Sequence, residues 1–280
     1  MNRFYIWAVS FTCFGLSGAQ EDHSVINDER RIVVLVCSYN NKPWYRWNLD
    51  AIRKQRYSNY HVLYIDDCSP DGTGQLVQEY IDEHQWHDKV TLVRNTVRRG
   101  PMANQYHAVH DYCDDMDIVV ICDGDDRFAH ADVLSFVNKV YADGSVWLTY
   151  GQFKVYPSGA RGFCCPMPEA VVKNNAFRRF VHIPSHLRTF YAGLFKQIKL
   201  EDLMYDGAFL KMDADIAAMF PMIEMARDHF RFIPNVLLEY NDANVLNEHK
   251  ISRELQIKLD KHIRSLAPYD RAVSPRVPKK

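Results

Sequence analysis

The chain has 280 residues, of which 47% are hydrophobic and 25% are charged. This composition supplies an ordinary hydrophobic core and excludes a disordered chain or one saturated with membrane spans. The formal net charge of −1 gives no overall attraction to nucleic acid or to an anionic membrane, because those partners need an excess of Lys and Arg. We therefore expect one compact domain that recognises anions locally and binds no nucleic acid.

The first nineteen residues have the pattern of a secretory signal peptide. An apolar run over residues 4–16 is followed by Ser17-Gly18-Ala19, with small residues where a signal peptidase reads. The run is shorter than the roughly 20 residues that span a bilayer. We expect cleavage after Ala19, a short linker over 20–30, and a mature chain without an integral membrane span. Its location would be a secretory lumen, a bacterial periplasm or the medium, and an uncleaved membrane tether is the alternative.

Residues 31–151 alternate short apolar runs with polar stretches of helical length. Strands are expected at 32–36, 62–65, 90–93 and 118–121, and helices at 44–55, 75–84 and 102–112. Continuous apolar runs rich in β-branched residues are typical of parallel strands buried on both faces. The order predicts an α/β fold with a Rossmann-like, doubly wound, mainly parallel sheet. In such sheets ligands bind beyond the carboxyl ends of the strands.

After residue 151 the pattern is looser. An amphipathic helix with Pro221 in its middle is expected at 213–226, and a last strand, interrupted by Pro234, at 232–240. The basic segment that ends the chain contains prolines, and we expect a flexible tail over 266–280.

Paired acids follow two of the four predicted strands, as Asp66-Asp67 and as Asp123-Gly124-Asp125-Asp126. Carboxylates in such a loop can hold a divalent ion. In the transfer of a sugar from a nucleotide diphosphate, a bound divalent ion can neutralise the charge of the departing diphosphate. Asp125 is suited to hold Mn²⁺ or Mg²⁺, and Asp123 could reach the same metal or the ribose. A solvated acidic turn is the alternative.

Asp66 and Asp67 close the second strand, where a carboxylate could accept a hydrogen bond from N3–H of uracil. Alternatively, they stabilise the amino terminus of the next helix through its dipole. No GxGxxG or GxxxxGK[ST] motif follows any predicted strand, which argues against a dinucleotide and against ATP held by a phosphate-binding loop.

Three segments, Ile32 to Asn41, Tyr64 to Thr73 and Ile118 to Phe128, resemble the signature segments of inverting family 2 glycosyltransferases with the type-A fold. Arg94 to Asn104 resembles the loop and helix between the second and third of them. The resemblance is looser over 186–191, 215–226 and 240–250. One departure is Cys37, where the family more often has Thr or Pro, and it concerns nucleotide packing rather than the reaction.

The resemblance implies inverting, metal-assisted transfer of a hexosyl or N-acetylhexosaminyl group from a nucleotide diphosphate sugar, in our reading a UDP-sugar, to a hydroxyl group. The acceptor would be a glycan, glycoprotein or glycolipid. It implies a base at the start of the helix after the acceptor-binding segment, which is Asp215, with Asp213 as the competitor. A helix cap at Asp213 is the alternative. The remaining implied contacts are with the donor (Ser38, Tyr39, Arg99, Lys250) and with the metal (His249).

The domain is therefore expected at 31–265, with a nucleotide-sugar-binding half over 31–151 and an acceptor-binding half over 152–265. Two rivals are a nucleotidyltransferase and an inactive carbohydrate-binding or scaffolding protein on the same fold. The first would have a Gly-rich, basic loop after the first strand, and Cys37 to Pro43 is not such a loop. The intact acids Asp125 and Asp215 argue against the second.

Overall fold

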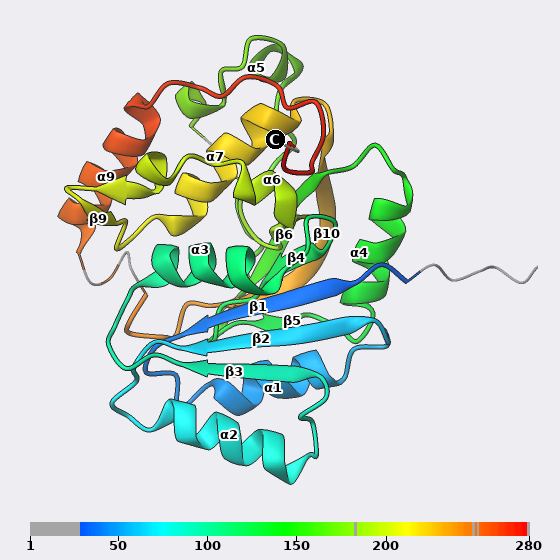
Figure 1. The fold of residues 1–280 in the computed structure, drawn as a ribbon, viewed down its shortest axis with the longest axis vertical. Helices are drawn as coiled ribbons and strands as arrows, with labels where there is room; N and C mark the ends of the chain where they lie inside the picture. The colour runs from blue at the N-terminus through cyan, green and yellow to red at the C-terminus, as the bar shows by residue number, and fades with distance from the viewer. Residues whose placement is uncertain (1–28, 182–183, 248–249, 251, 279–280) are drawn as a thin grey trace, which may run out of the picture.

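The computed structural model describes residues 29–181, 184–247, 250 and 252–278. In this part of the chain eight strands form one mixed sheet in the order β3-β2-β1-β4-β7-β6-β10-β5 (Figure 1). Its strands are β1 (Ile32–Ser38), β2 (Tyr60–Asp66), β3 (Val90–Arg94), β4 (Ile118–Ile121), β5 (Arg127–Phe128), β6 (Leu148–Tyr156), β7 (Thr189–Tyr191) and β10 (Phe230–Asn241). A separate hairpin joins β8 (Met204–Tyr205) to β9 (Ala208–Phe209).

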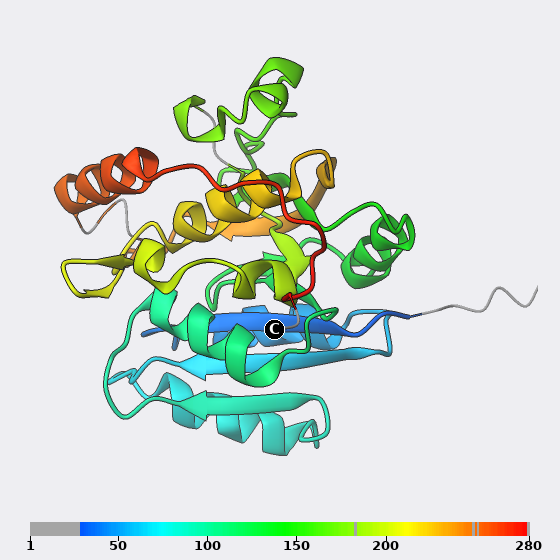
Figure 2. The same cartoon turned by 45° about the horizontal axis from the view of Figure 1, so that its top comes forward.

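Helices cover both faces of the sheet, with α1 and α2 on one side of β1, β2 and β3, and α3 on the other (Figures 1 and 2). The second side also carries α6, α7 and α9, which pack in succession from α3 outwards. The helices are α1 (Tyr45–Arg53), α2 (Thr73–Glu83), α3 (Pro101–Tyr112), α4 (Val133–Ala142), α5 (Glu169–Lys173), α6 (Ala192–Lys196), α7 (Ala214–Ala226) and α9 (Arg253–Ser265), with short 3-10 helices η1 (Phe177–Arg179) and η2 (Leu200–Leu203).

The four strands and three helices predicted for residues 31–151 are all present. Strand β1 pairs in parallel with β2 on one side and β4 on the other, and β2 pairs in parallel with β3. The apolar residues of β1 and β4 are almost fully buried, as expected for strands covered on both faces. The predicted mainly parallel α/β architecture is confirmed, and the carboxyl ends of β1, β2 and β4 lie at one edge of the sheet.

The second half of the sheet contains strands that the sequence did not predict. Strand β7 lies antiparallel between β4 and β6, with Phe190 opposite both Val119 and Leu148. It has three residues, too few for a periodic signal. Strand β10 does appear near its predicted place, and its register shifts between Ile233 and Val236. This shift in register is a β-bulge, and Pro234 lies within it. A proline is tolerated there although its ring nitrogen cannot donate a hydrogen bond to the neighbouring strand.

Helix α7 differs from the predicted amphipathic helix. Twelve of its thirteen residues are buried, because α6, α9, η1, η2 and β6 surround it. An amphipathic pattern is expected when one face meets solvent, and here only Asp215 keeps a partly open side chain. The prediction of amphipathicity was therefore wrong, and the exception on this helix is the carboxylate predicted to act as base.

The carboxyl-terminal segment runs back across the domain (Figure 1). The backbone N–H of Ala272 donates to the carbonyl of Met225, and that of Val277 donates to Asp115. These groups have partners in the domain, and the flexibility expected over 266–280 stays a prediction.

Residues 1–28, which include the predicted signal peptide and most of the linker, lie outside the described residues. No helix in the described part of the chain has the length and apolarity to cross a membrane. The six cysteines found there carry free thiols.

Candidate active site

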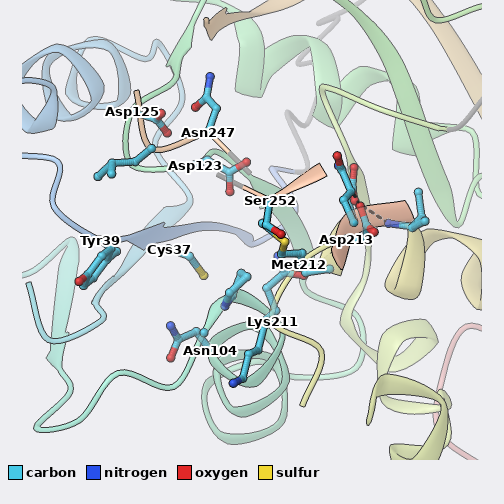
Figure 3. A pocket seen from close by; sticks show the side chains of 18 of the residues that line it. Cys37, Tyr39, Asn104, Asp123, Asp125, Lys211, Met212, Asp213, Asn247 and Ser252 are labelled. Carbon is cyan, nitrogen blue, oxygen red and sulfur yellow. Dashed lines mark hydrogen bonds between the residues drawn. The ribbon is translucent and has the colours of Figure 1, made fainter. Parts of the chain in front are cut away.

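A cavity of about 1280 Å³ opens at the carboxyl edge of the sheet (Figure 3). Its walls come from the end of β1, the loop after β4, the loop before α3, the start of α7, and α9. Figure 3 shows Tyr39, Asp123 and Asp213 around this space, so residues from both halves of the chain meet in it. Ligand binding at this edge is what the sheet topology predicts.

The acidic loop after β4 lies directly against the end of β1. The N–H of Gly124 donates to the carbonyl of Cys37 at 3.0 Å. A Cβ atom at Gly124 would lie 2.7 Å from Oγ of Ser38, so this close approach requires glycine. The side-chain amide of Asn48 donates to the carbonyls of Asp123 and Asp126 at 3.0 and 2.8 Å. The loop is thus held at both ends by the first strand and helix.

Burial and mutual repulsion perturb the carboxyl groups of this loop. Burial raises the pKa of Asp125 to about 6, while a hydrogen bond from Asn244 to Oδ2, 2.6 Å long, opposes the shift. Burial raises the pKa of Asp123 as well, and the charge of Arg188 opposes that shift. Asp126 is 1% exposed, and burial together with the neighbouring carboxylates raises its pKa well above the usual range. Clustered buried acids of this kind are stabilised by a cation.

Ligand atoms of Asp123, Asp126 and His186 lie within 4.8 Å of one another. Oδ2 of Asp126 and Nδ1 of His186 are buried and have no hydrogen-bond partner among the described residues. Burial and the charge of Arg188 hold the pKa of His186 well below its usual value, so the imidazole is neutral and able to bind a metal. Buried polar atoms normally have partners, so this set of residues fits a divalent cation. A mixed oxygen and nitrogen set favours Mn²⁺ over Mg²⁺.

The predicted metal ligands have different positions in the structure. Asp123 belongs to the group just described, whereas Asp125 lines the same cavity and is held by Asn244. His249 lies outside the described residues.

Ser38 and Tyr39, predicted donor contacts, line the cavity at the end of β1. Oγ of Ser38 accepts from the Tyr64 hydroxyl at 2.9 Å, and Ser38 is 2% exposed, so it orders the strand end. The guanidinium of Arg98 lies over the Tyr39 ring at 3.8 Å. Tyr39, Arg98 and Arg99 therefore combine an aromatic face with positive charge in one wall of the cavity.

The two acids at the end of β2 have separate environments. Asp67 lines the cavity and accepts hydrogen bonds from the N–H groups of Arg99 and Gly100, both at 2.8 Å. Asp66 instead packs at the start of α2, where a Cβ atom at Gly74 would lie 2.4 Å from its Oδ2. Burial raises the pKa of Asp66. Of the pair, the structure brings Asp67 to the predicted donor site, and Asp66 has the helix environment that was the alternative.

Lys250 does not belong to the cavity wall. Its ammonium donates to the carbonyls of Asp242 and Asn244, the latter at 3.2 Å, and pairs with the Asp242 carboxylate. This lysine thus secures the loop after β10, whose Asn244 holds Asp125.

At the far side of the cavity, Asp213 and Asp215 mark the start of α7. Asp213 occupies the N-cap position of α7 with a left-handed backbone, and Asp215 lies in the first turn, as in the cap alternative, although the Asp213 side chain makes no capping hydrogen bond. Oδ1 of Asp213 accepts from Gln256 of α9 at 3.1 Å. Burial and the charge of Asp215 raise the pKa of Asp213 to about 7. Asp215 forms an ion pair with Arg188 at 3.4 Å.

Comparison with known proteins identifies the family of this chain. The family model described as Glycosyl transferase family 2 matches residues 33–201, more than half of the sequence. The chain belongs to glycosyltransferase family 2. The protein EpsE of Bacillus subtilis (strain 168), which is classed as a glycosyltransferase, is 25% identical over 101 residues, or 36% of this chain and 35% of that protein. The chain therefore aligns with about a third of the length of this relative.

Solved glycosyltransferase structures share the fold. TarS residues 1–349 of S. aureus, in complex with UDP-GlcNAc, is 18% identical with a TM-score of 0.60, covering 83% of this chain and 65% of that one. The mannosyltransferase PcManGT of Pyrobaculum calidifontis, in complex with GDP-Man and Mn²⁺, is 24% identical with a TM-score of 0.58, covering 87% and 67%. At these identities the likeness shows a common type-A fold.

The sequence analysis missed several residues of this candidate site. Asp126 was part of the acidic loop but had no predicted role, and His186 and Arg188 lay in a segment whose family resemblance had been noted. Asn244 follows the last strand. Its only signal was a polar residue after the carboxyl end of a strand, which is where sheets of this class bind ligands.

Proposed function

We propose that this family 2 glycosyltransferase transfers a hexosyl or N-acetylhexosaminyl group from a UDP-sugar to an acceptor hydroxyl by direct displacement, with inversion. One observation supports the proposal most. A single cavity has a cation-compatible acidic group on one side and the carboxylates Asp213 and Asp215 on the other. The relatives in complex with UDP-GlcNAc and with GDP-Man and Mn²⁺ are consistent with such a donor.

The donor side has the residues that a nucleotide diphosphate requires. Asp123, Asp126 and His186 would hold Mn²⁺, which when bound neutralises charge on the departing diphosphate. Arg98 and Arg99 add positive charge in the same cavity, and Tyr39 offers an aromatic face to the uracil ring of the donor. These contacts bind and orient the donor.

The proposed general base is Asp215. Its side chain is 29% exposed and opens into the cavity from the first turn of α7. An acceptor hydroxyl must lose its proton as it attacks, and a positioned base typically contributes about 10²- to 10⁴-fold. Asp213 is the second candidate, because a pKa of about 7 lies near the pH at which a general base is most effective.

Substitution of each acid by Asn tests both assignments. The measured reaction is UDP release in the presence of Mn²⁺ from UDP-glucose, UDP-galactose, UDP-GlcNAc and UDP-GalNAc, with water as acceptor. We expect Asp215→Asn to bind UDP as wild type does and to lose at least about 100-fold in turnover. A large loss in Asp213→Asn with near-normal Asp215→Asn would assign the base to Asp213.

Two outcomes would remove the proposal itself. If neither substitution lowers turnover, direct displacement with a carboxylate base is wrong. If the wild-type protein binds UDP and Mn²⁺ but releases UDP from none of the four donors and transfers to no glycan, the chain is a carbohydrate-binding protein on this fold.

The acceptor in this proposal is a glycan, glycoprotein or glycolipid bound beside α7 and α9. Export through cleavage after Ala19 is part of the proposal. It rests on residues 1–19 of the sequence, which lie outside the described residues.

A further inference from the structure

Arg188 lies between the donor side and the base side of the cavity. Its side chain is 6% exposed, yet it lines the cavity. Nη2 lies 3.2 Å from Oδ2 of Asp123, and Nη1 lies 3.4 Å from Oδ2 of Asp215. One buried cation therefore contacts the first acid of the acidic loop and the proposed base.

The fold explains why an arginine is found at this point. Arg188 directly precedes β7, and its carbonyl accepts from the N–H of Ile121 at the end of β4. Asp123 follows Ile121 by two residues, so the pairing of β4 with β7 sets the side chain beside the acidic loop. The unpredicted strand β7 thus connects the two halves of the site.

The contacts of Asp215 leave its carboxylate little freedom. Oδ1 accepts from the N–H of Ile216 at 2.8 Å, and Oδ2 faces Arg188. Each carboxylate oxygen has two lone-pair positions, so Asp215 can still accept a hydrogen bond from an acceptor hydroxyl in the cavity. A guanidinium is planar and holds carboxylates at defined angles, unlike the point charge of lysine.

Resting on the proposed function, we propose that Arg188 is a positioning residue that acts through Asp215, fixing the base relative to the donor side. A general base must lie within hydrogen-bond reach of its proton, and a misplacement of about 1 Å can cost about 10²-fold in rate. Loss of Arg188 should therefore lower turnover mainly because Asp215 loses its orientation.

A double-mutant cycle tests this role, using UDP release from the best of the four UDP-sugars. Arg188→Met should lower turnover about 100-fold, while the dissociation constant of UDP measured with Mn²⁺ changes about threefold or less. In an Asp215→Asn background, Arg188→Met should cost about threefold or less, because the group it positions is already absent. Arg188→Lys should restore part of the rate, since it keeps the charge without the planar fork.

The matched control is Arg178→Met. Arg178 is also 6% exposed and paired with a carboxylate, Glu224, but it does not line the cavity. The Arg178→Met substitution should lower the melting temperature and leave the turnover of the folded protein near that of the wild type.

Three results would overturn the inference. They are an equal loss of turnover in the Asp215→Asn background, a loss of UDP affinity as large as the loss of turnover, or an equal loss in Arg178→Met. If Arg188→Met does not fold, Arg188→Lys replaces it in the cycle, with a smaller loss of turnover in the otherwise wild-type protein and again about threefold or less in the Asp215→Asn background. Failure of Asp215→Asn alone to lower turnover would instead refute the proposed base, which the cycle reports separately.

Discussion

The aspartates of this cavity have different environments, and we expect different roles for them. Burial is the main cause of the raised pKa of Asp123, Asp125, Asp126 and Asp213. Arg188 opposes the shift at Asp123, and Asn244 opposes it at Asp125. Acids with shifted pKa values in a cleft are a feature of functional sites.

The metal group leads to a prediction at a single histidine. Because Nδ1 of His186 is buried without a hydrogen-bond partner in the described part of the chain, we expect His186→Gln to weaken Mn²⁺ binding about tenfold. Calorimetric titration of Mn²⁺ in the presence of UDP measures it, with His110→Gln, a half-buried histidine outside the cavity, as control. Unchanged affinity in His186→Gln would remove this histidine from the site.

Asp125 is tested in the same titration. The sequence predicts that Asp125 binds the metal too, and we expect it to add to the group formed by Asp123, Asp126 and His186. Asp125→Ala should then strongly reduce the strengthening of UDP binding by Mn²⁺, and it should leave the fold intact because its side chain faces the cavity and Asn244. Equal strengthening in the variant would leave the metal to Asp123, Asp126 and His186.

Asp213 makes stability depend on pH. Its pKa is about 7 in the folded chain and near 4 when unfolded, so between these values the folded state binds the extra proton. Stability therefore falls as pH rises from about 4 to 7. Asp213→Asn lacks this term, so its melting temperature relative to wild type should rise by a few degrees from pH 5 to pH 8. A constant difference across these pH values would contradict the assignment.

At the scale of elements, a buried ion pair secures the helices behind the cavity. Arg178 of η1 forms two hydrogen bonds of 2.7 and 2.9 Å with Glu224 of α7 and a third with the carbonyl of Ile263 in α9. Glu224 also accepts from the N–H of Tyr269 in the carboxyl-terminal segment. One ion pair therefore connects four parts of the chain.

Removal of one partner of this pair should be costly. Arg178→Met leaves the Glu224 carboxylate buried without its cation, and we expect a loss of about 3 kcal/mol in the free energy of unfolding. Denaturant unfolding followed by circular dichroism measures the loss. Addition of Glu224→Gln should recover part of it, because the uncompensated charge is then absent. A loss below about 1 kcal/mol would show that the pair is not important for stability.

At the scale of the whole molecule, β1, β2 and the loop before α3 enclose one end of the cavity, and we expect donor choice to depend on this end. Asp67 accepts from Asn95 and from two backbone N–H groups, which leaves one of roughly four lone-pair positions free. Uracil offers a donor at N3, whereas cytosine offers an acceptor there. We therefore expect the Asp67 carboxylate to favour uridine nucleotides.

We expect UDP to bind at least about tenfold more tightly than CDP, in line with the cost of leaving a buried acceptor unpaired. Competition calorimetry with Mn²⁺ present compares the two nucleotides. Comparable affinities for UDP and CDP would show that Asp67 serves only to order the loop at Gly100.

The sequence by itself determined the first four strands, the three helices between them and the place of the acidic loop, but not β5, α4 or β6. The apolar runs of β1 and β4 and the helical spacing between strands are local signals that neighbouring residues encode. Parallel strands bring their carboxyl ends to one edge, so Asp123 and Tyr39 could be predicted to meet without knowing distant contacts.

Only the tertiary structure decided which residues complete the site. His186 and Arg188 reach the acidic loop because the three-residue strand β7 lies between β4 and β6. No local periodicity in the sequence predicts this pairing. Asp215 is the open position on α7 because four helical elements and a strand cover the rest of that helix. Burial of this kind depends on partners far along the chain, so hydrophobic spacing could predict the helix but not which of its residues faces the cavity.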